Sequence, residues 1–130
     1  MKLESLDFLY MPSVDPAAEI DYFESVLGAK VAFRIEAFGT RVGMVRMVDG
    51  PPALLFAGHL QGDRPILVYR VESLDDAVAE LEAEGGTVSH EFGIPHGPVR
   101  EVELPGGHRM AIYELTRPET AQHLEGRRDF

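Results

Sequence analysis

Cysteine and tryptophan are both absent from this chain of 130 residues. Without cysteine there can be no disulfide bond, no thiolate metal ligand and no thiol nucleophile. No apolar run approaches the roughly 18 residues that a membrane-spanning helix requires, and Met1–Glu4 does not begin a signal peptide. We therefore expect a cytoplasmic protein that does not span a membrane.

Positive charge is also scarce. The 12 Lys and Arg residues face 22 Asp and Glu residues, which gives a formal net charge of −10. A strongly negative protein is repelled by nucleic acid and by anionic membrane surfaces, so we expect neither as a partner. The apolar content of 45% is ordinary for a globular protein, and the length suits one domain.

The clearest local pattern is a hairpin over residues 99–115. Pro105, Gly106 and Gly107 suit a tight turn, because proline fixes φ and glycine tolerates positive φ. In the second strand, alternation places Met110 and Ile112 on one face and Arg109, Ala111 and Tyr113 on the other. We expect the first face to pack against a helix and the second to line the interior.

The first half of the chain predicts a strand, a helix and three further strands. The first strand covers Leu6–Met11, and the helix begins with Asp15 as N-cap and ends before Gly28. The three strands that follow are expected at residues 30–36, 42–48 and 53–57.

The second half repeats this order after a polar linker at residues 59–64. A strand over residues 66–71 precedes a helix that Ser73 caps. We then expect a strand through Val88, a loop rich in Gly and Pro at residues 93–98, and the hairpin. The repeat predicts two modules, 1–58 and 65–115, in a single domain over residues 1–117. The charged tail, 118–130, is expected to be frayed or packed on a partner.

This order of elements, together with three stretches, resembles the vicinal oxygen chelate superfamily, which includes glyoxalase I, extradiol dioxygenases and bleomycin-resistance proteins. The stretches are FLYMPSVDPAAEIDYFESVLGAKV, YRVESLDDAVAELEAEGGTV and IPHGPVREVELPGGHRMAIYEL. The resemblance implies an α+β fold in which two βαβββ modules form an open, barrel-like cleft. It also implies a homodimer, and a divalent metal held by side chains from four strands.

The four positions that would hold the metal are apolar in this sequence. The resemblance places them at Phe8, within residues 54–57, at Ile66 and at Ala111. None of these side chains carries a nitrogen or oxygen donor that could bind a divalent cation. We therefore expect a cleft without a metal and no cofactor.

The residues expected to line the cleft come from strand alternation and from the resemblance. They are Phe8, Tyr10, Phe56, Ile66, Val68, Arg70, His96, Arg109, Ala111 and Tyr113. Aromatic rings beside a small alanine suit a planar ligand, but the same residues would equally fill the space between the modules as ordinary core.

Polar candidates for chemistry are few. His96 lies in the 93–98 loop, which borders the cleft in the superfamily, and it could form an acid–base pair with Glu101. Arg70 and Arg109 could hold an anionic group of a ligand, or could form salt bridges with nearby acidic residues.

Two functions follow, together with a third possibility. The first is a metal-free protein of the bleomycin-resistance type that binds a small apolar or aromatic molecule. The second is a lyase, isomerase or dioxygenase of the superfamily, using either a metal gathered by His59, His96 and nearby carboxylates or an acid–base site. The third is a resemblance of architecture alone, with a solid core between the modules.

Overall fold

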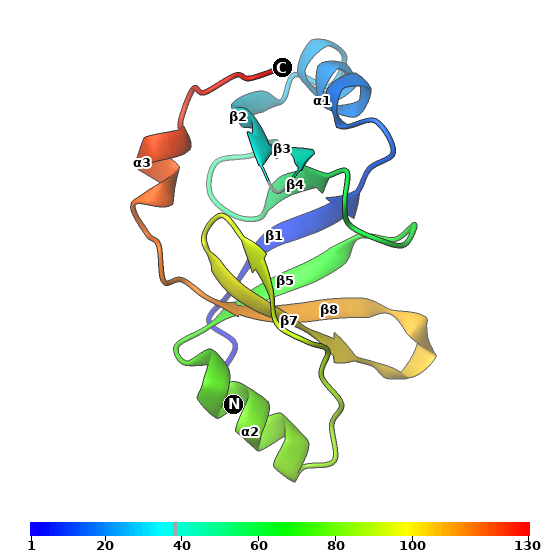
Figure 1. Ribbon diagram of the computed structural model, residues 1–130, viewed down its shortest axis with the longest axis vertical. Helices are drawn as coiled ribbons and strands as arrows, with labels where there is room; N and C mark the ends of the chain where they lie inside the picture. Colours follow the sequence, from blue (N-terminus) through cyan, green and yellow to red (C-terminus); the bar gives the residue numbers. More distant parts are fainter. Residues whose placement is uncertain (38) are drawn as a thin grey trace.

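The computed structural model describes residues 1–37 and 39–130. One eight-stranded sheet, in the order β2-β3-β4-β1-β5-β8-β7-β6, forms its centre (Figure 1). The strands are β1 (Ser5–Pro12), β2 (Lys30–Ala37), β3 (Thr40–Arg46), β4 (Ala53–Ala57), β5 (Ile66–Val71), β6 (Phe92–Ile94), β7 (Gly97–Glu103) and β8 (Arg109–Glu114). The helices are α1 (Pro16–Ser25), α2 (Leu74–Ala83) and α3 (Thr120–Leu124). In the part of the chain so described, no helix is long and apolar enough to cross a membrane.

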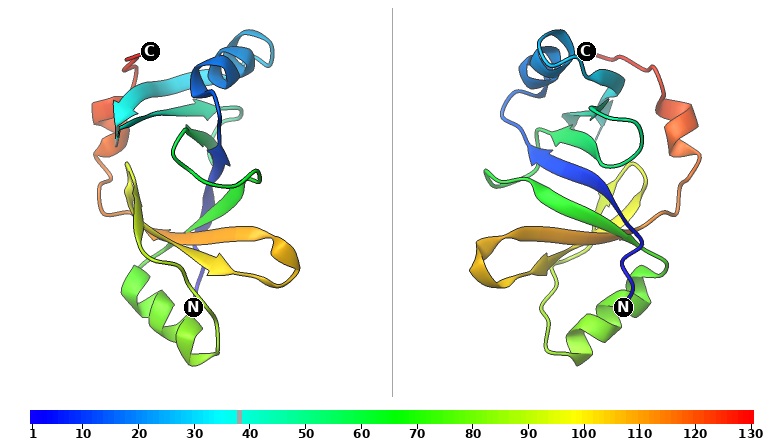
Figure 2. Two further views of the ribbon diagram at one scale, coloured as in Figure 1. Left: turned by 45° about the vertical axis from the view of Figure 1, so that its right-hand side comes forward. Right: turned by 180° about the vertical axis from the view of Figure 1, so that it is seen from behind.

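The order strand, helix, three strands occurs twice and is built in the same way each time. β1 pairs in parallel with β4, and β5 pairs in parallel with β8. The two halves meet where β1 and β5 pair antiparallel at the centre of the sheet. The sheet curls into an open half-barrel with α1 and α2 on its outer face (Figure 2). The predicted α+β fold class is therefore confirmed.

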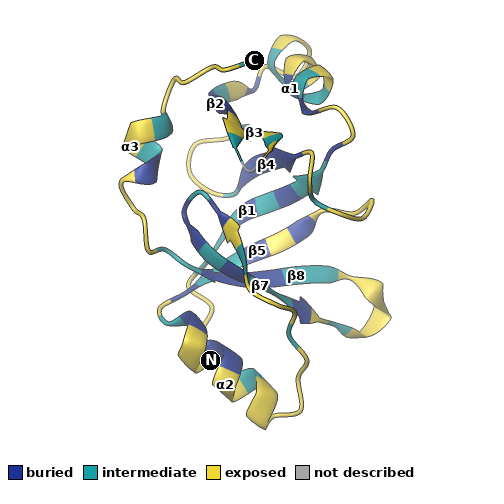
Figure 3. Ribbon diagram, viewed as in Figure 1, coloured by how far each residue is buried: buried dark blue, intermediate teal, exposed yellow. Residues whose placement is uncertain are grey.

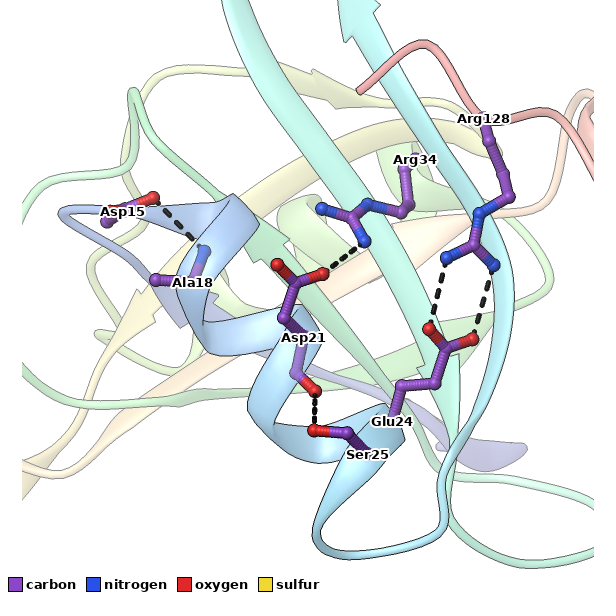
Figure 4. Close-up of polar contacts among 7 residues, drawn as sticks. All are labelled: Asp15, Ala18, Asp21, Glu24, Ser25, Arg34 and Arg128. Atoms are coloured by element: carbon purple, nitrogen blue, oxygen red, sulfur yellow. Dashed lines mark hydrogen bonds and ion pairs between the residues drawn. The ribbon is translucent and has the colours of Figure 1, made fainter.

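Both long helices begin at the predicted N-caps. An Asp15 side-chain oxygen accepts a hydrogen bond of 3.1 Å from the Ala18 amide (Figure 4), and the Ser73 hydroxyl oxygen accepts one of 3.2 Å from the Asp76 amide. Each bond satisfies one of the amides that a helix leaves unpaired in its first turn.

Alternation along the strands separates an inner face from an outer face. The outer side chains pack under α1 and α2; Ile112 of β8, for example, lies with Leu74 and Val78 of α2. The inner side chains form one cluster, buried to 9% exposure or less (Figure 3). That cluster comprises Phe8, Tyr10, Ala32, Phe33, Ile35, Val42, Met44, Ala53, Leu55, Ala57, Ile66, Val68, Ile94, Val99, Ala111 and Tyr113.

The region before β7 differs from the prediction. Val88 forms only an isolated bridge with Val102, and the strand lies instead at β6, where a loop was expected. β6 and β7 form a hairpin with Pro95 and His96 between the paired residues Ile94 and Gly97. Two features of this hairpin explain the difference. Ile94 is fully buried, so β6 contributes to the core. A Cβ at position 97 would overlap the carbonyl oxygen of Glu114, so the close approach of β7 to β8 requires the glycine there.

The C-terminal segment, residues 118–130, is not frayed but packs on its own chain, and we call it the C-terminal strap. It continues from β8 past the β6–β7 hairpin to the edge of β2 (Figure 2). There the Gly126 amide donates to the Ala32 carbonyl (2.7 Å), and the Arg34 amide donates to the Arg127 carbonyl (2.8 Å). An edge strand exposes unpaired backbone groups, and here the chain's own end pairs with some of them.

Side chains fasten the strap as well. Arg128 binds both carboxylate oxygens of Glu24 at 3.0 and 3.2 Å (Figure 4), and Arg46 binds both of Glu125 at 3.1 Å. In α3, the partly buried Leu124 packs against the inner cluster. The strap therefore combines exposed ion pairs with apolar contacts, Leu124 on the inner cluster and Phe130 on the cluster under α1.

We expect the buried contact of Leu124 to contribute more to the free energy of unfolding than an exposed polar residue of the strap. Leu124→Ala is expected to lower the free energy of unfolding by about 1–2 kcal/mol, since it removes methyl groups from a partly buried site. The exposed Gln122→Ala, in the same short helix, should leave it within about 0.5 kcal/mol. Urea denaturation measures both. Equal losses in the two variants would show that Leu124 does not pack on the interior.

Candidate functional site

Six of the predicted cleft residues lie together on the inner face of the half-barrel. They come from β1, β5 and β8, and are Phe8, Tyr10, Ile66, Val68, Ala111 and Tyr113. Adjacent strands bring them together: Phe8 is opposite Val68, which is opposite Ala111. Their role in binding a ligand remains a prediction.

Phe56 lies on the other face, so its placement in the cleft was wrong. Its ring packs against Phe23 of α1 at a centroid distance of 5.1 Å, in the cluster that includes Ile20. In β4 it is Leu55 that points inward. All five residues of β4 are apolar and buried, so alternation could not distinguish the two faces from sequence.

A bulge in β1 brings an acidic side chain to this inner face. The register between β1 and β5 shifts between Leu6 and Phe8, which leaves Asp7 as an extra residue. One Asp7 oxygen accepts a hydrogen bond from the Tyr113 hydroxyl, and the other accepts one from the Ser5 hydroxyl at 2.5 Å. The Arg70 Nε lies 3.6 Å from the Asp7 carboxylate.

His96, in the β6–β7 turn, lies against the same group of residues. Its ring centroid is 4.6 Å from that of Phe8, whose ring also contacts Tyr113 at 5.5 Å. The residue is 6% exposed, and its Nδ1 has no hydrogen-bond partner among residues 1–37 and 39–130. Burial lowers the pKa of His96 to about 4, despite the opposing charge of Asp7, so the imidazole is neutral at pH 7.

Two tyrosine hydroxyls are further polar groups on the inner face. Burial and the hydrogen bond to Asp7 both raise the pKa of Tyr113. Burial raises the pKa of Tyr10 to about 12, and its hydroxyl lies 3.4 Å from Nε2 of His59. Burial lowers the pKa of His59. Both tyrosines therefore stay protonated at neutral pH and can donate hydrogen bonds.

The two predicted arginines have different surroundings. Arg70 lies beside Asp7, whereas Arg109 donates to Glu101 from Nε (2.8 Å) and from Nη2 (3.3 Å). Arg109 also donates to the Gln61 carbonyl at 2.8 Å. The predicted acid–base pair of His96 with Glu101 does not fit this arrangement, because Arg109 already binds the Glu101 carboxylate.

The inner face does not fit the divalent metal that the resemblance implies. The inward side chains at the four strand positions are Phe8, Leu55, Ile66 and Ala111, none of which can coordinate a cation. Across the described parts of the chain, no three His, Asp or Glu side chains come close enough together to hold a metal ion. His59 and His96 are therefore not joined by carboxylates in a ligand set.

Comparison with known proteins identifies the fold. No family model and no curated protein matches this sequence. Solved structures with the same fold were found, and this fold is the one that the vicinal oxygen chelate resemblance predicted.

The similar structures include epimerases and a protein of unstated function. Methylmalonyl-CoA epimerase from Mycobacterium tuberculosis has a TM-score of 0.71 at 16% identity, covering 86% of this chain and 88% of that one. A variant of the Streptomyces coelicolor epimerase, in complex with 2-nitronate-propionyl-CoA, has a TM-score of 0.74 at 14% identity, covering 89% and 97%. A hypothetical protein from Bacillus halodurans has a TM-score of 0.71 at 12% identity, covering 85% and 93%. At these identities the likeness shows the fold alone.

Asp7 and Ser5 were missed from the sequence. Strict alternation from Phe8 and Tyr10 would put Asp7 on the outer face, and only the bulge brings it inward. The available signal was a single acidic residue inside a strand that is otherwise apolar on both faces. Such a residue needs buried partners, and a search for them would have led to Tyr113 and Arg70.

The buried His96 should make stability depend on pH. Its folded-state pKa of about 4 lies below the ordinary value of 6.5, so the unfolded chain binds more protons between these values. This contribution to the free energy of unfolding is fully present above pH 6.5 and is lost, on the order of 3 kcal/mol, as the pH falls to 4. Urea denaturation between pH 7 and 4 should give a shallower pH dependence for His96→Phe than for the unmodified protein. Parallel curves would contradict the assignment.

Proposed function

We propose that this protein binds a small, largely apolar molecule, aromatic compounds included, inside the half-barrel and without a metal. The observation that supports this most is the set of inward residues at the four strand positions, which are hydrocarbon or aromatic. Such a lining favours a ligand by apolar area and shape. It cannot polarise a ligand oxygen as a cation would.

Polar groups at one end of the lining would orient the ligand. Asp7 lies beside Arg70 and Tyr113, and Phe8 packs against Tyr113 and His96. We call Asp7, Arg70, Tyr113 and His96 the polar end. The other residues of the inner cluster are apolar apart from the Tyr10 hydroxyl, which lies beside the exposed His59. A ligand with one polar group would therefore have a preferred orientation, because only one end of the lining concentrates hydrogen-bonding groups.

Ligand entry would require the C-terminal strap or the β6–β7 turn to move, because the inner side chains are buried. Much of the strap's attachment is through exposed ion pairs, such as Arg46–Glu125 and Arg128–Glu24. Exposed pairs contribute about 0–1 kcal/mol each, so this part of the structure can open at lower cost than the central strands.

An isomerase without a metal is the second candidate. Structural neighbours are epimerases, one of them in complex with a CoA compound, and a buried neutral imidazole such as that of His96 is a group that can accept a proton. Incorporation of deuterium from D₂O into methylmalonyl-CoA, lost in His96→Phe, would favour this function over simple binding. The homodimer and the cytoplasmic location remain predictions.

A titration with small aromatic and aliphatic compounds, in the presence of a metal chelator, tests binding in the half-barrel. At least one compound should raise the melting temperature and shift the NMR methyl signals of Ile66, Val68 and Ala111, because these side chains line the inner face. The methyl signals of Leu54, which packs on the outer face, provide the matched internal control. Shifts confined to outer residues, or no binding by any compound, would contradict the proposal.

A further inference from the structure

Two buried nitrogen atoms of the polar end lack hydrogen-bond partners in the described chain. One is Nδ1 of the 6%-exposed His96, and the other is Nε of Arg70, whose separation of 3.6 Å from Asp7 makes an ion pair but not a hydrogen bond. Buried polar groups in folded proteins are nearly always paired, so each exception needs a physical explanation. One of these atoms lies in the ion pair with Asp7, and the other is on the ring that packs against the neighbouring Phe8. Two such atoms in one group of residues favour a binding site over a packing defect.

The other polar atoms here already have partners. The Tyr113 hydroxyl and the Ser5 hydroxyl both donate to Asp7. A ligand at the polar end would therefore form new hydrogen bonds mainly with His96 and Arg70, whose nitrogen atoms are unpartnered in the described chain. The His96 ring is held in place by Phe8, which packs against it and also against the ring of Tyr113.

The charges of the polar end favour a neutral ligand group. The negative Asp7 and the positive Arg70 lie side by side and offset each other. A ligand carboxylate would be attracted by Arg70 and repelled by Asp7, and an ammonium group the reverse, so neither ion gains from this pair as a whole. Arg117, whose guanidinium binds the Ile94 and Pro95 carbonyls next to His96, adds one positive charge outside the pair. Either ion would also lose its hydration on entering an apolar interior.

Among neutral groups, a hydroxyl matches best. It donates one hydrogen bond and accepts others, so it can pair with Nδ1 of a neutral imidazole in either tautomer and also accept from an arginine N–H. A carbonyl oxygen can only accept, and would fail with the tautomer in which Nδ1 has no proton.

We propose that the polar end recognises the hydroxyl group of a small neutral alcohol whose apolar body lies along the inner face, with Nδ1 of His96 as the principal hydrogen-bond partner. This inference rests on the proposed function and specifies the class of its ligand. It makes His96 a specificity-determining residue, because a ligand without the hydroxyl would leave Nδ1 buried and unpaired.

Four compounds that differ only in their polar group test the inference: benzyl alcohol, toluene, benzoate and benzylamine. Titration followed by NMR or calorimetry at pH 7 should show benzyl alcohol binding about tenfold more tightly than any of the others. Benzyl alcohol should also shift the ¹⁵N resonance of His96 Nδ1 in the unmodified protein, and toluene should shift it much less. This measurement uses the unmodified protein, so it does not depend on whether a variant folds.

The His96→Phe variant separates hydrogen bonding from packing. It keeps an aromatic ring against Phe8 but removes both ring nitrogens, so the preference for benzyl alcohol over toluene should disappear while toluene still binds. His90→Phe, at an exposed position, is the matched control and should keep the preference.

The outcomes distinguish this inference from the function on which it rests. Equal binding of toluene and benzyl alcohol, or tightest binding of benzoate or benzylamine, would overturn the hydroxyl assignment and leave apolar binding intact. A preference that survives in His96→Phe would show that His96 is not the partner. Absence of binding by all four compounds, together with failure of the wider compound set, would overturn the proposed function itself.

Discussion

The antiparallel pairing of β1 with β5 joins the two modules into one sheet, and the composition of the interior depends on it. The register places Phe8 beside Val68 and Tyr10 beside Ile66, and Ala111 follows on β8. A slip of one residue would turn every one of these side chains to the outer face and bring the residues under α1 and α2 inward. Because the inward positions carry hydrocarbon and aromatic groups, the half-barrel differs in its chemistry from one that is built around a cation.

The bulge at Asp7 departs from this regularity and introduces a charge. It brings a carboxylate to the inner face, where the Tyr113 and Ser5 hydroxyls, together with Arg70, compensate its burial. Burial leaves His96 neutral despite the charge of Asp7, and its Nδ1 has no hydrogen-bond partner in the described parts of the chain. Bulges and unpaired buried groups both cost stability, and their coincidence at one end of an apolar interior is typical of a functional site rather than of core packing.

Much of the fold was predictable from the sequence, because it is encoded in local signals. The caps at Asp15 and Ser73 and the alternation in β8 each follow from a few neighbouring residues. The features that were missed depend on distant partners. Phe56 could not be assigned to a face in a uniformly apolar strand, Asp7 turned inward only through a register shift against β5, and the strap pairs with β2 some 90 residues away in the chain. The apolar part of the candidate site and three residues of its polar end, Arg70, His96 and Tyr113, were accordingly named from the sequence, whereas Asp7 was not.

The central claim is that the inner face of this half-barrel is built for an apolar ligand and not for a cation. Calorimetric titration of the chelator-treated protein with Zn²⁺, Ni²⁺, Mn²⁺ and Fe²⁺ tests it most directly. The residues at the inward positions predict no stoichiometric binding of any of the four ions. One tightly bound ion per chain, with NMR shifts at Phe8 and Ala111, would contradict the account.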